Sequence, residues 1–340
     1  MRSTVKCLAL VLAACFVLTA FCGCSSSAAI QVGKTKISEK DYFYWLLSYK
    51  MSQLQSAGGT VEESFWSTDM GDGVTLAESL KNAAIDQAVT FALTDYLFEK
   101  NGLTFTEDEL KAISGEITSL EATSSFASTL KSFGISVSDY TRMYYQQKRY
   151  YKVFAHYFGD SGLTPISDEQ VEQFYLDEYV RIKHIQLKLT DAEGKALDSA
   201  TVTAKRTQAQ TLLAQALAAS AEDFDIMITD YSEDSGKTTY PEGYIFNNTM
   251  SFPKEFMTAS FEMKVGDVRL VETSSGLHIM RKEALDPDAY LTGTRATQVK
   301  AACAQELFKE LLIGVRDELG VTLNEEIIHK YDVATITYLS

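Results

Sequence analysis

The chain has 340 residues, of which 46% are hydrophobic and only four are proline, and its formal net charge is −15. That length is enough for two or three domains, and the composition is typical of an ordered, largely helical globular protein. The strong acidity, with no cluster of lysine or arginine, argues against a nucleic-acid-binding protein.

The first residues have the pattern of an export signal. Arg2 and Lys6 give a positive start, and residues 8–21 carry no charge. This run is shorter than the roughly 20 apolar residues that a membrane-spanning helix needs, so a secretory signal is the better interpretation. Cys24 follows a glycine and precedes three serines, an arrangement that resembles a bacterial lipobox. We therefore expect a lipoprotein signal peptide over 1–23 and a lipid on Cys24, with a plain signal peptide as the alternative.

This leader also predicts where the mature chain works. We expect it at the extracytoplasmic face of the cell membrane. Because no basic patch would help to bind anionic lipid, the acyl chains alone would anchor it. Four of the five cysteines lie within the first 24 residues, which leaves Cys303 in an apolar helical pattern. Cys303 is therefore predicted to be a small core residue, and the exported fold is expected to hold without a disulfide.

Residues 24–179 are predicted to form a helical arm that carries no motif for chemistry. It opens with a short hairpin or strand over 30–37, and residues 138–157 carry tyrosines at helical spacing, which is typical of the wall of a core or groove. Capping boxes indicate helix starts, because a serine or threonine is followed three residues later by an acidic residue or glutamine. These boxes are Thr75–Glu78, Thr106–Glu109 and Ser167–Gln170.

The pattern changes at Val180, where a strand-like alternation begins. It places Ile182 and His184 on one face of the first strand. The segments that follow are a helix over 199–220 and strands over 268–271 and 277–281. Together they predict a compact α+β module over 180–285.

Helical character returns after this module. Residues 286–340 are predicted to be a second helical arm, with one helix over 297–319 and a tail that alternates again over 333–339. The module is thus inserted between two helical arms.

Short segments of the module follow one another in a specific order and spacing. They are RIKHI at 181–185, EDF at 222–224, DYSEDS at 230–235, GYIF at 243–246, FMTASF at 256–261, VGDV at 265–268 and VETSSGLHI at 271–279. This ordered set resembles a parvulin-type peptidylprolyl isomerase domain across 180–285. With the lipoprotein leader, the layout resembles the PrsA-like extracytoplasmic foldase lipoproteins. The resemblance implies an α+β fold, in which a small antiparallel sheet with helices is inserted between arms that form one SurA/PrsA-like chaperone domain.

The resemblance also implies an active site on the module. His184 and His278 match the paired histidines at the base of the site, and Thr273 matches a hydroxyl beside them. Asp234 occupies the position that is cysteine or aspartate in the family, next to the substrate carbonyl. A structural role is the alternative in each case, since two imidazoles can simply hydrogen-bond to each other and Asp234 lies in a polar loop that could form a turn.

A proline pocket is implied in the same way. Phe246 and Phe256 match its aromatic walls. The third wall is usually methionine or leucine in the family, and here two residues compete for it. Counting back from Phe256 leads to Phe252, whereas Met250 fits only if two residues are inserted. The glycines expected before Phe246 are partly replaced, in the sequence TYPEG of 239–243.

The chemistry of such a site needs no nucleophile, metal or cofactor. Resonance gives the peptide C–N bond a rotational barrier of roughly 18–20 kcal/mol, so an X–Pro bond isomerises in tens of seconds without help. A catalyst has to hold the twisted imide in an apolar pocket with a few fixed polar groups beside the bond. The four histidines of the chain have no metal-ligand spacing, and we expect no cofactor.

Two functions follow from these observations. The first is a peptidylprolyl cis-trans isomerase and foldase that acts on unfolded or newly exported polypeptides with X–Pro bonds. The alternative is a holdase with a parvulin fold and little or no turnover, whose helical arms bind unfolded chains. We expect no nucleic-acid partner and a membrane contact through the lipid anchor. A homodimer is compatible with the sequence, which does not itself set the oligomeric state.

Overall fold

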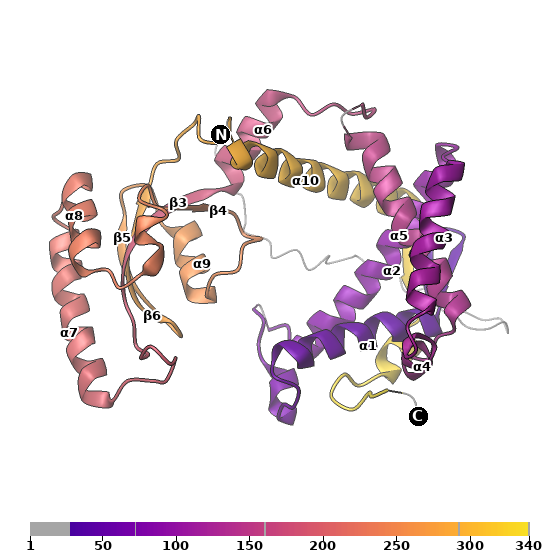
Figure 1. Ribbon diagram of the computed structural model, residues 1–340, viewed down its shortest axis with the longest axis horizontal. Helices are drawn as coiled ribbons and strands as arrows, with labels where there is room; N and C mark the ends of the chain where they lie inside the picture. The colour runs from indigo at the N-terminus through magenta and orange to yellow at the C-terminus, as the bar shows by residue number, and fades with distance from the viewer. Residues whose placement is uncertain (1–27, 72, 160, 292, 339–340) are drawn as a thin grey trace. The chain divides into compact units, whose positions relative to one another are not determined.

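The computed structural model describes residues 28–71, 73–159, 161–291 and 293–338, and these divide into two compact units (Figure 1). The first unit holds the described residues up to Pro165 together with those from Glu306 onward, and the second runs from Ile166 to Gln305. The signal peptide predicted over 1–23 and the lipidation of Cys24 lie outside the described residues. No helix in the described part of the chain is both long and apolar enough to cross a membrane.

The first unit joins the two ends of the described chain through a small antiparallel sheet. Strand β1 (Ala28–Val32) pairs with β2 (Thr35–Ser38) on one side and with β7 (Val321–Leu323) on the other. Residues from both ends also share one apolar core, which includes Ile30 and Phe308. Most of the two predicted helical arms thus forms one unit, whereas residues 166–179 and 286–305 of the predicted arms belong to the second unit.

The helices of this unit begin at local signals in the sequence. Thr75 and Thr106 open the predicted capping boxes, and Ser136 opens a third one with Asp139. Each box provides hydrogen-bond partners for amides that the first helical turn leaves free. The helices are α1 (Glu39–Ser56), α2 (Leu76–Lys100), α3 (Glu107–Glu121), α4 (Phe126–Ser132), α5 (Val137–Phe158), α11 (Glu325–Lys330) and a short 3₁₀ helix over Glu63–Ser67.

The second unit is built on a four-stranded antiparallel sheet in the order β4-β3-β6-β5. One face packs on helix α9 through a core that includes Ile182, Phe256 and Met280, and the opposite face packs on α7 and α8 through Ile185 and Phe224 (Figure 1). The elements are β3 (Val180–Leu187), α7 (Ser199–Ala216), α8 (Ala221–Tyr231), β4 (Tyr244–Phe246), α9 (Lys254–Glu262), β5 (Val268–Thr273) and β6 (Gly276–Glu283). The predicted α+β module with a small antiparallel sheet is confirmed.

Two further helices complete this unit, and one of them crosses its boundary. Helix α6 (Asp168–Glu178) begins at the predicted capping box of Ser167, and α10 (Gly293–Leu319) continues past Gln305. Tyr175 of α6 packs on Val299 of α10 in a small separate core. Cys303 is buried nearby, as predicted for a small core residue.

Two segments differ from the sequence prediction. The helix expected over 199–220 ends at Ala216, because the hydroxyl of Ser220 caps a new helix, α8. The alternating tail forms no strand among its described residues. The Asp332 carboxylate instead accepts the amide of Ala334, and the Asp332 carbonyl accepts the amide of Ile336, which gives a turn.

Candidate active site

Two histidines meet on the α9 face of the four-stranded sheet. His184 lies on β3 and His278 on β6, where the register pairs His278 with Gln186. Because side chains alternate along a strand, both imidazoles point to the face on which Phe256 of α9 packs. Their rings are coplanar, with the two Nδ1 atoms 3.0 Å apart. The sheet register thus brings together two residues that are 94 positions apart in the sequence.

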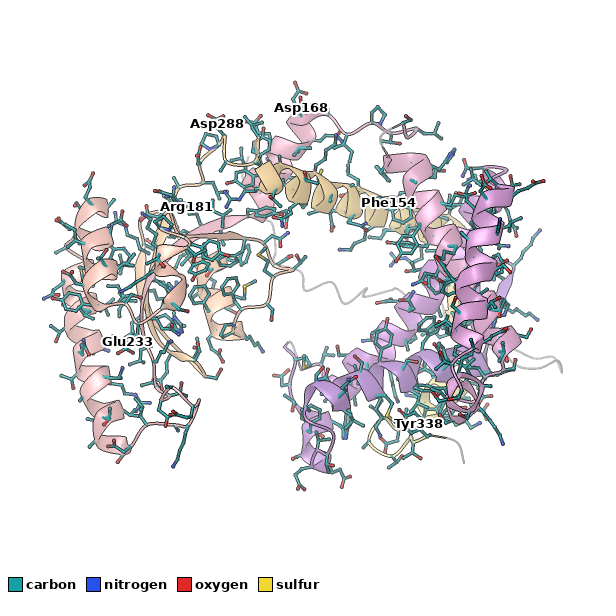
Figure 2. All side chains as sticks on the ribbon, viewed as in Figure 1. Phe154, Asp168, Arg181, Glu233, Asp288 and Tyr338 are labelled. Carbon is teal, nitrogen blue, oxygen red and sulfur yellow. The ribbon has the colours of Figure 1, made fainter. Side chains whose placement is uncertain are left out.

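Asp234 is brought to the same place by a loop that is hydrogen-bonded along β3. The Ser232 hydroxyl accepts the amides of Gln186 (3.1 Å) and Asp234 (3.3 Å). Glu233, labelled in Figure 2, donates its amide to the Gln186 carbonyl at 2.8 Å. These bonds place the Asp234 carboxylate 3.0 Å from Nε2 of His184.

The hydroxyl expected beside the histidines is also present. Thr273 ends β5, and its Oγ1 lies 2.9 Å from Nε2 of His278. The Ser275 hydroxyl lies 3.3 Å from the same nitrogen, and the Ser275 amide donates to Thr273 Oγ1 at 3.1 Å. The tight turn between β5 and β6 therefore supplies two hydroxyls to one imidazole nitrogen.

Thr273, His278, His184 and Asp234 form a row of hydrogen bonds, and every donor in this row points toward Asp234. An ionised Asp234 only accepts hydrogen bonds, so Nε2 of His184 carries the proton and, in a neutral ring, Nδ1 of His184 is an acceptor. Nδ1 of His278 must then donate to it, which leaves Nε2 of His278 to accept from Thr273. All donors in this tautomer assignment lead toward the carboxylate, and hydrogen bonds aligned in this way strengthen one another in a buried setting.

Burial and hydrogen bonding determine the charge states of the row. Burial by itself would raise the pKa of Asp234, but hydrogen bonds from His184, Tyr244 and the Gly236 amide outweigh it and lower that pKa. Burial and the neighbouring His184 lower the pKa of His278 to about 4, against an opposing effect of Asp234. At neutral pH the row therefore has an ionised carboxylate at one end and a neutral imidazole near the other.

An aromatic cluster borders the histidines. The ring of Phe256 lies 5.3 Å from each imidazole, and Phe246 and Phe252 pack beside it at 6.1 and 5.4 Å between ring centroids. Phe246 and Phe256 are fully buried, whereas Phe252 is half-buried. Met250 is 46% exposed and lies outside this cluster. Of the two residues that compete for the third wall, the structure thus places Phe252 against the other two.

Sequence reasoning missed three polar residues of this arrangement: Ser232, Tyr244 and Ser275. The Tyr244 hydroxyl donates to Oδ2 of Asp234 at 2.7 Å. A signal for Tyr244 was available, because it lies two residues before Phe246 on the same strand and therefore shares its face. Ser275 lies in the turn between β5 and β6 and Ser232 in the loop after α8, where the sequence gives no comparable indication of side-chain direction.

The Thr273 hydroxyl is hydrogen-bonded to His278, but both side chains are buried, so this hydroxyl is not presented to a substrate as a nucleophile would have to be. Among the residues that the structure describes, no group of three or more histidine, cysteine or acidic side chains is placed to hold a metal ion. What the geometry offers is a partly exposed aromatic ring, Phe252, packed on two buried ones, next to a half-buried carboxylate that is fixed by hydrogen bonds.

Comparison with known families agrees with this geometry. Residues 169–284 match the family model of the PPIC-type PPIase domain. This segment is a PPIC-type PPIase domain. The prediction of a parvulin-type peptidylprolyl isomerase domain is thereby confirmed, and the match also includes α6, which precedes the predicted module.

Solved structures that match three quarters or more of this chain include two PrsA proteins and a SurA-like chaperone. PrsA from Bacillus cereus is 16% identical, with 75% of this chain and 91% of that chain covered at a TM-score of 0.30. PrsA from Bacillus subtilis is 19% identical (78% and 91% covered, TM-score 0.23), and a SurA-like chaperone of Campylobacter jejuni is 15% identical (86% and 95%, TM-score 0.24). No curated protein matches the chain.

Proposed function

We propose that the chain is a prolyl isomerase that assists the folding of newly exported polypeptides. The observation that carries this proposal is the row of hydrogen bonds from Thr273 through His278 and His184 to Asp234, which lies beside the aromatic cluster of Phe246, Phe252 and Phe256. The match to an isomerase family does not favour the alternative of an inactive holdase.

The carboxylate has a definite task in this mechanism. A planar imide carries partial negative charge on its oxygen through resonance, and rotation about the C–N bond removes that charge separation. A fixed negative charge next to the oxygen therefore raises the energy of the planar bond more than that of the twisted one. Asp234 is held ionised and half-buried by its hydrogen bonds, so its charge acts with little screening by water.

The aromatic cluster binds the other half of the substrate bond. The proline ring would pack on Phe252, the partly exposed member of the cluster, with the buried Phe256 ring behind it. This contact keeps water away from the imide while it rotates. His184 and His278 are positioning residues in this scheme, because they align Asp234 and do not exchange protons with the substrate. Each reduction of the barrier by about 1.4 kcal/mol accelerates isomerisation tenfold.

The test is cis-trans exchange in a series of X–Pro peptides, measured by NMR with the purified chain. We expect Asp234→Ala to lower kcat/KM by about tenfold or more, since it removes the charge. Asp230→Ala is the matched control, because Asp230 is an exposed aspartate at the end of α8 and its loss gives the same change of net charge. An Asp234→Ala variant as active as the wild type would contradict the catalytic role of Asp234. A folded wild-type protein without isomerase activity would favour the alternative, a holdase that only binds unfolded chains.

The location follows from the leader. We infer that the signal peptide of 1–23 is removed and that a lipid on Cys24 holds the protein at the outer face of the cytoplasmic membrane, where exported chains emerge. Incorporation of labelled palmitate that is lost in Cys24→Ser would support this anchor. Sedimentation of the solubilised protein distinguishes a monomer from the homodimer that the sequence allows.

A further inference from the structure

Tyr244 helps to lower the pKa of Asp234, and its placement indicates a second role, in the orientation of the carboxylate. Its hydroxyl donates to Oδ2 of Asp234 at 2.7 Å, the same oxygen that accepts Nε2 of His184 at 3.0 Å. Its ring also packs edge-on against the His184 imidazole, with centroids 5.5 Å apart. Tyr244 thus contacts both members of the His184–Asp234 pair, from a neighbouring strand.

This placement depends on the absence of a side chain at Gly236. The Gly236 amide donates to the other carboxylate oxygen, Oδ1 of Asp234, at 2.9 Å. A Cβ atom at this position would overlap the Tyr244 hydroxyl oxygen and lie 3.0 Å from its Cζ. Gly236 does not have a left-handed backbone conformation, so space, and not φ, is what requires glycine here.

Together these contacts fix the carboxylate from both sides. Oδ1 is held by a backbone amide, and Oδ2 is held by an imidazole and a phenol from two different strands. If the Tyr244 hydroxyl were absent, His184 would be the remaining hydrogen-bond donor to Oδ2, and the carboxylate could rotate about its Cβ–Cγ bond. Hydrogen bonds to a charged acceptor are the stronger kind and are directional, so the phenol restricts this rotation.

We propose that Tyr244 is a positioning residue for the isomerase, which holds the Asp234 carboxylate in the orientation that faces the substrate carbonyl, and that Gly236 provides the room for its hydroxyl. This inference rests on the proposed function for its effect on catalysis. The contact itself is independent of that function. The pair Gly236 and Tyr244 therefore acts as one unit, and changes at the two positions should not be additive.

The experiment is a double-mutant cycle in the full chain with Tyr244→Phe, Gly236→Ala and the double variant. Tyr240→Phe is the control, because it removes a hydroxyl from an exposed tyrosine in the adjacent loop. Three quantities are measured: kcat and KM for an X–Pro peptide, the imidazole ¹⁵N shifts of His184, and the free energy of unfolding. The unfolding measurement separates a loss of fold from a loss of orientation.

We expect Tyr244→Phe to lower kcat by about tenfold, the lower end of what one hydrogen bond to a charged group supplies, with little change in KM. Gly236→Ala should give the same loss, and the double variant should be no worse than either single one. The Nε2 shift of His184 should change in all three variants and stay the same in Tyr240→Phe.

Two results would overturn the proposal. One is an unchanged kcat and His184 shift in Tyr244→Phe, and the other is a double variant in which the two losses multiply. A wild type without turnover would refute the isomerase function, and the His184 shifts would then still decide whether Tyr244 and Gly236 position the carboxylate.

Discussion

At the scale of single residues, the proton positions in the row explain why its members are of these types. His278 has to be neutral, because its Nδ1 donates to His184 while its Nε2 accepts from Thr273. A second proton on His278 would remove the acceptor and place a charge in a buried site. The pKa of His278, lowered to about 4 by burial and by His184, is consistent with this requirement.

The lowered pKa makes stability depend on pH in a predictable direction. An unfolded histidine has a pKa near 6.5, so between pH 6.5 and about 4 the unfolded chain binds a proton that the folded chain does not. The free energy of unfolding should therefore fall as the pH falls through this range, by up to about 3 kcal/mol from His278. Urea unfolding at several pH values, followed on the PPIase domain, measures the slope.

His278→Gln is the variant that isolates this contribution. It removes the titrating group, so the fall in stability between pH 6.5 and 4 should become shallower even though the variant is less stable throughout. An equally steep dependence in His278→Gln would mean that other groups account for it.

At the scale of elements, the site depends on where the short strand β4 begins. Gly243 precedes β4 with a φ of +91°, and a Cβ atom there would lie 2.8 Å from the Ile182 carbonyl oxygen on β3. Only glycine combines this backbone conformation with such a close approach. Because Tyr244 and Phe246 follow directly on β4, the position of Gly243 determines where both side chains meet the site.

Gly243→Ala should destabilise the PPIase domain by more than the cost of placing alanine in a left-handed backbone conformation. A left-handed conformation costs a residue with a Cβ atom about 1–2 kcal/mol, and the contact with β3 adds to it. Gly266→Ala is a matched control, since Gly266 has a φ of +89° and open space around its Cβ position. Chemical denaturation of the two variants should show the larger loss for Gly243→Ala, and equal losses would contradict the role of the close approach.

At the scale of the whole molecule, contacts between the two ends of the described chain hold the helical unit together. β1 pairs with β7, and the buried Lys50 ammonium donates to the carbonyls of Ala334 (3.0 Å) and Ile336 (2.6 Å). These contacts lie within one unit with its own core. The unit therefore has the means to fold without the segment that is inserted into its sequence.

Deletion of residues 180–285 tests whether the arms bind unfolded chains by themselves. We expect the shortened protein to unfold cooperatively and to keep suppressing the aggregation of a denatured model protein, because the core of the helical unit is untouched. Isomerase activity should be absent. If a folded deletion variant no longer suppresses aggregation, the binding surface for unfolded chains includes the PPIase domain.

The sequence by itself determined the class of the domain and the helix starts, and it predicted most residues of the candidate site. Capping boxes such as Thr75–Glu78 are local, since the interacting groups lie within one helical turn, and the ordered segments of the module identify its family without any three-dimensional information. The sequence also narrowed the third pocket wall to Phe252 or Met250, and local spacing could not decide between them.

Only the tertiary structure decided how these residues meet. His184 and His278 are 94 positions apart, and His184 and Asp234 are 50 apart. Such pairs depend on the sheet register and on turns, which are set by contacts between distant segments and not by the residues nearby. For the same reason Tyr244 could be assigned to the site only when β4 was placed beside β3, and the alternating tail could be recognised as a turn only when Lys50 and Asp332 were seen to satisfy its backbone.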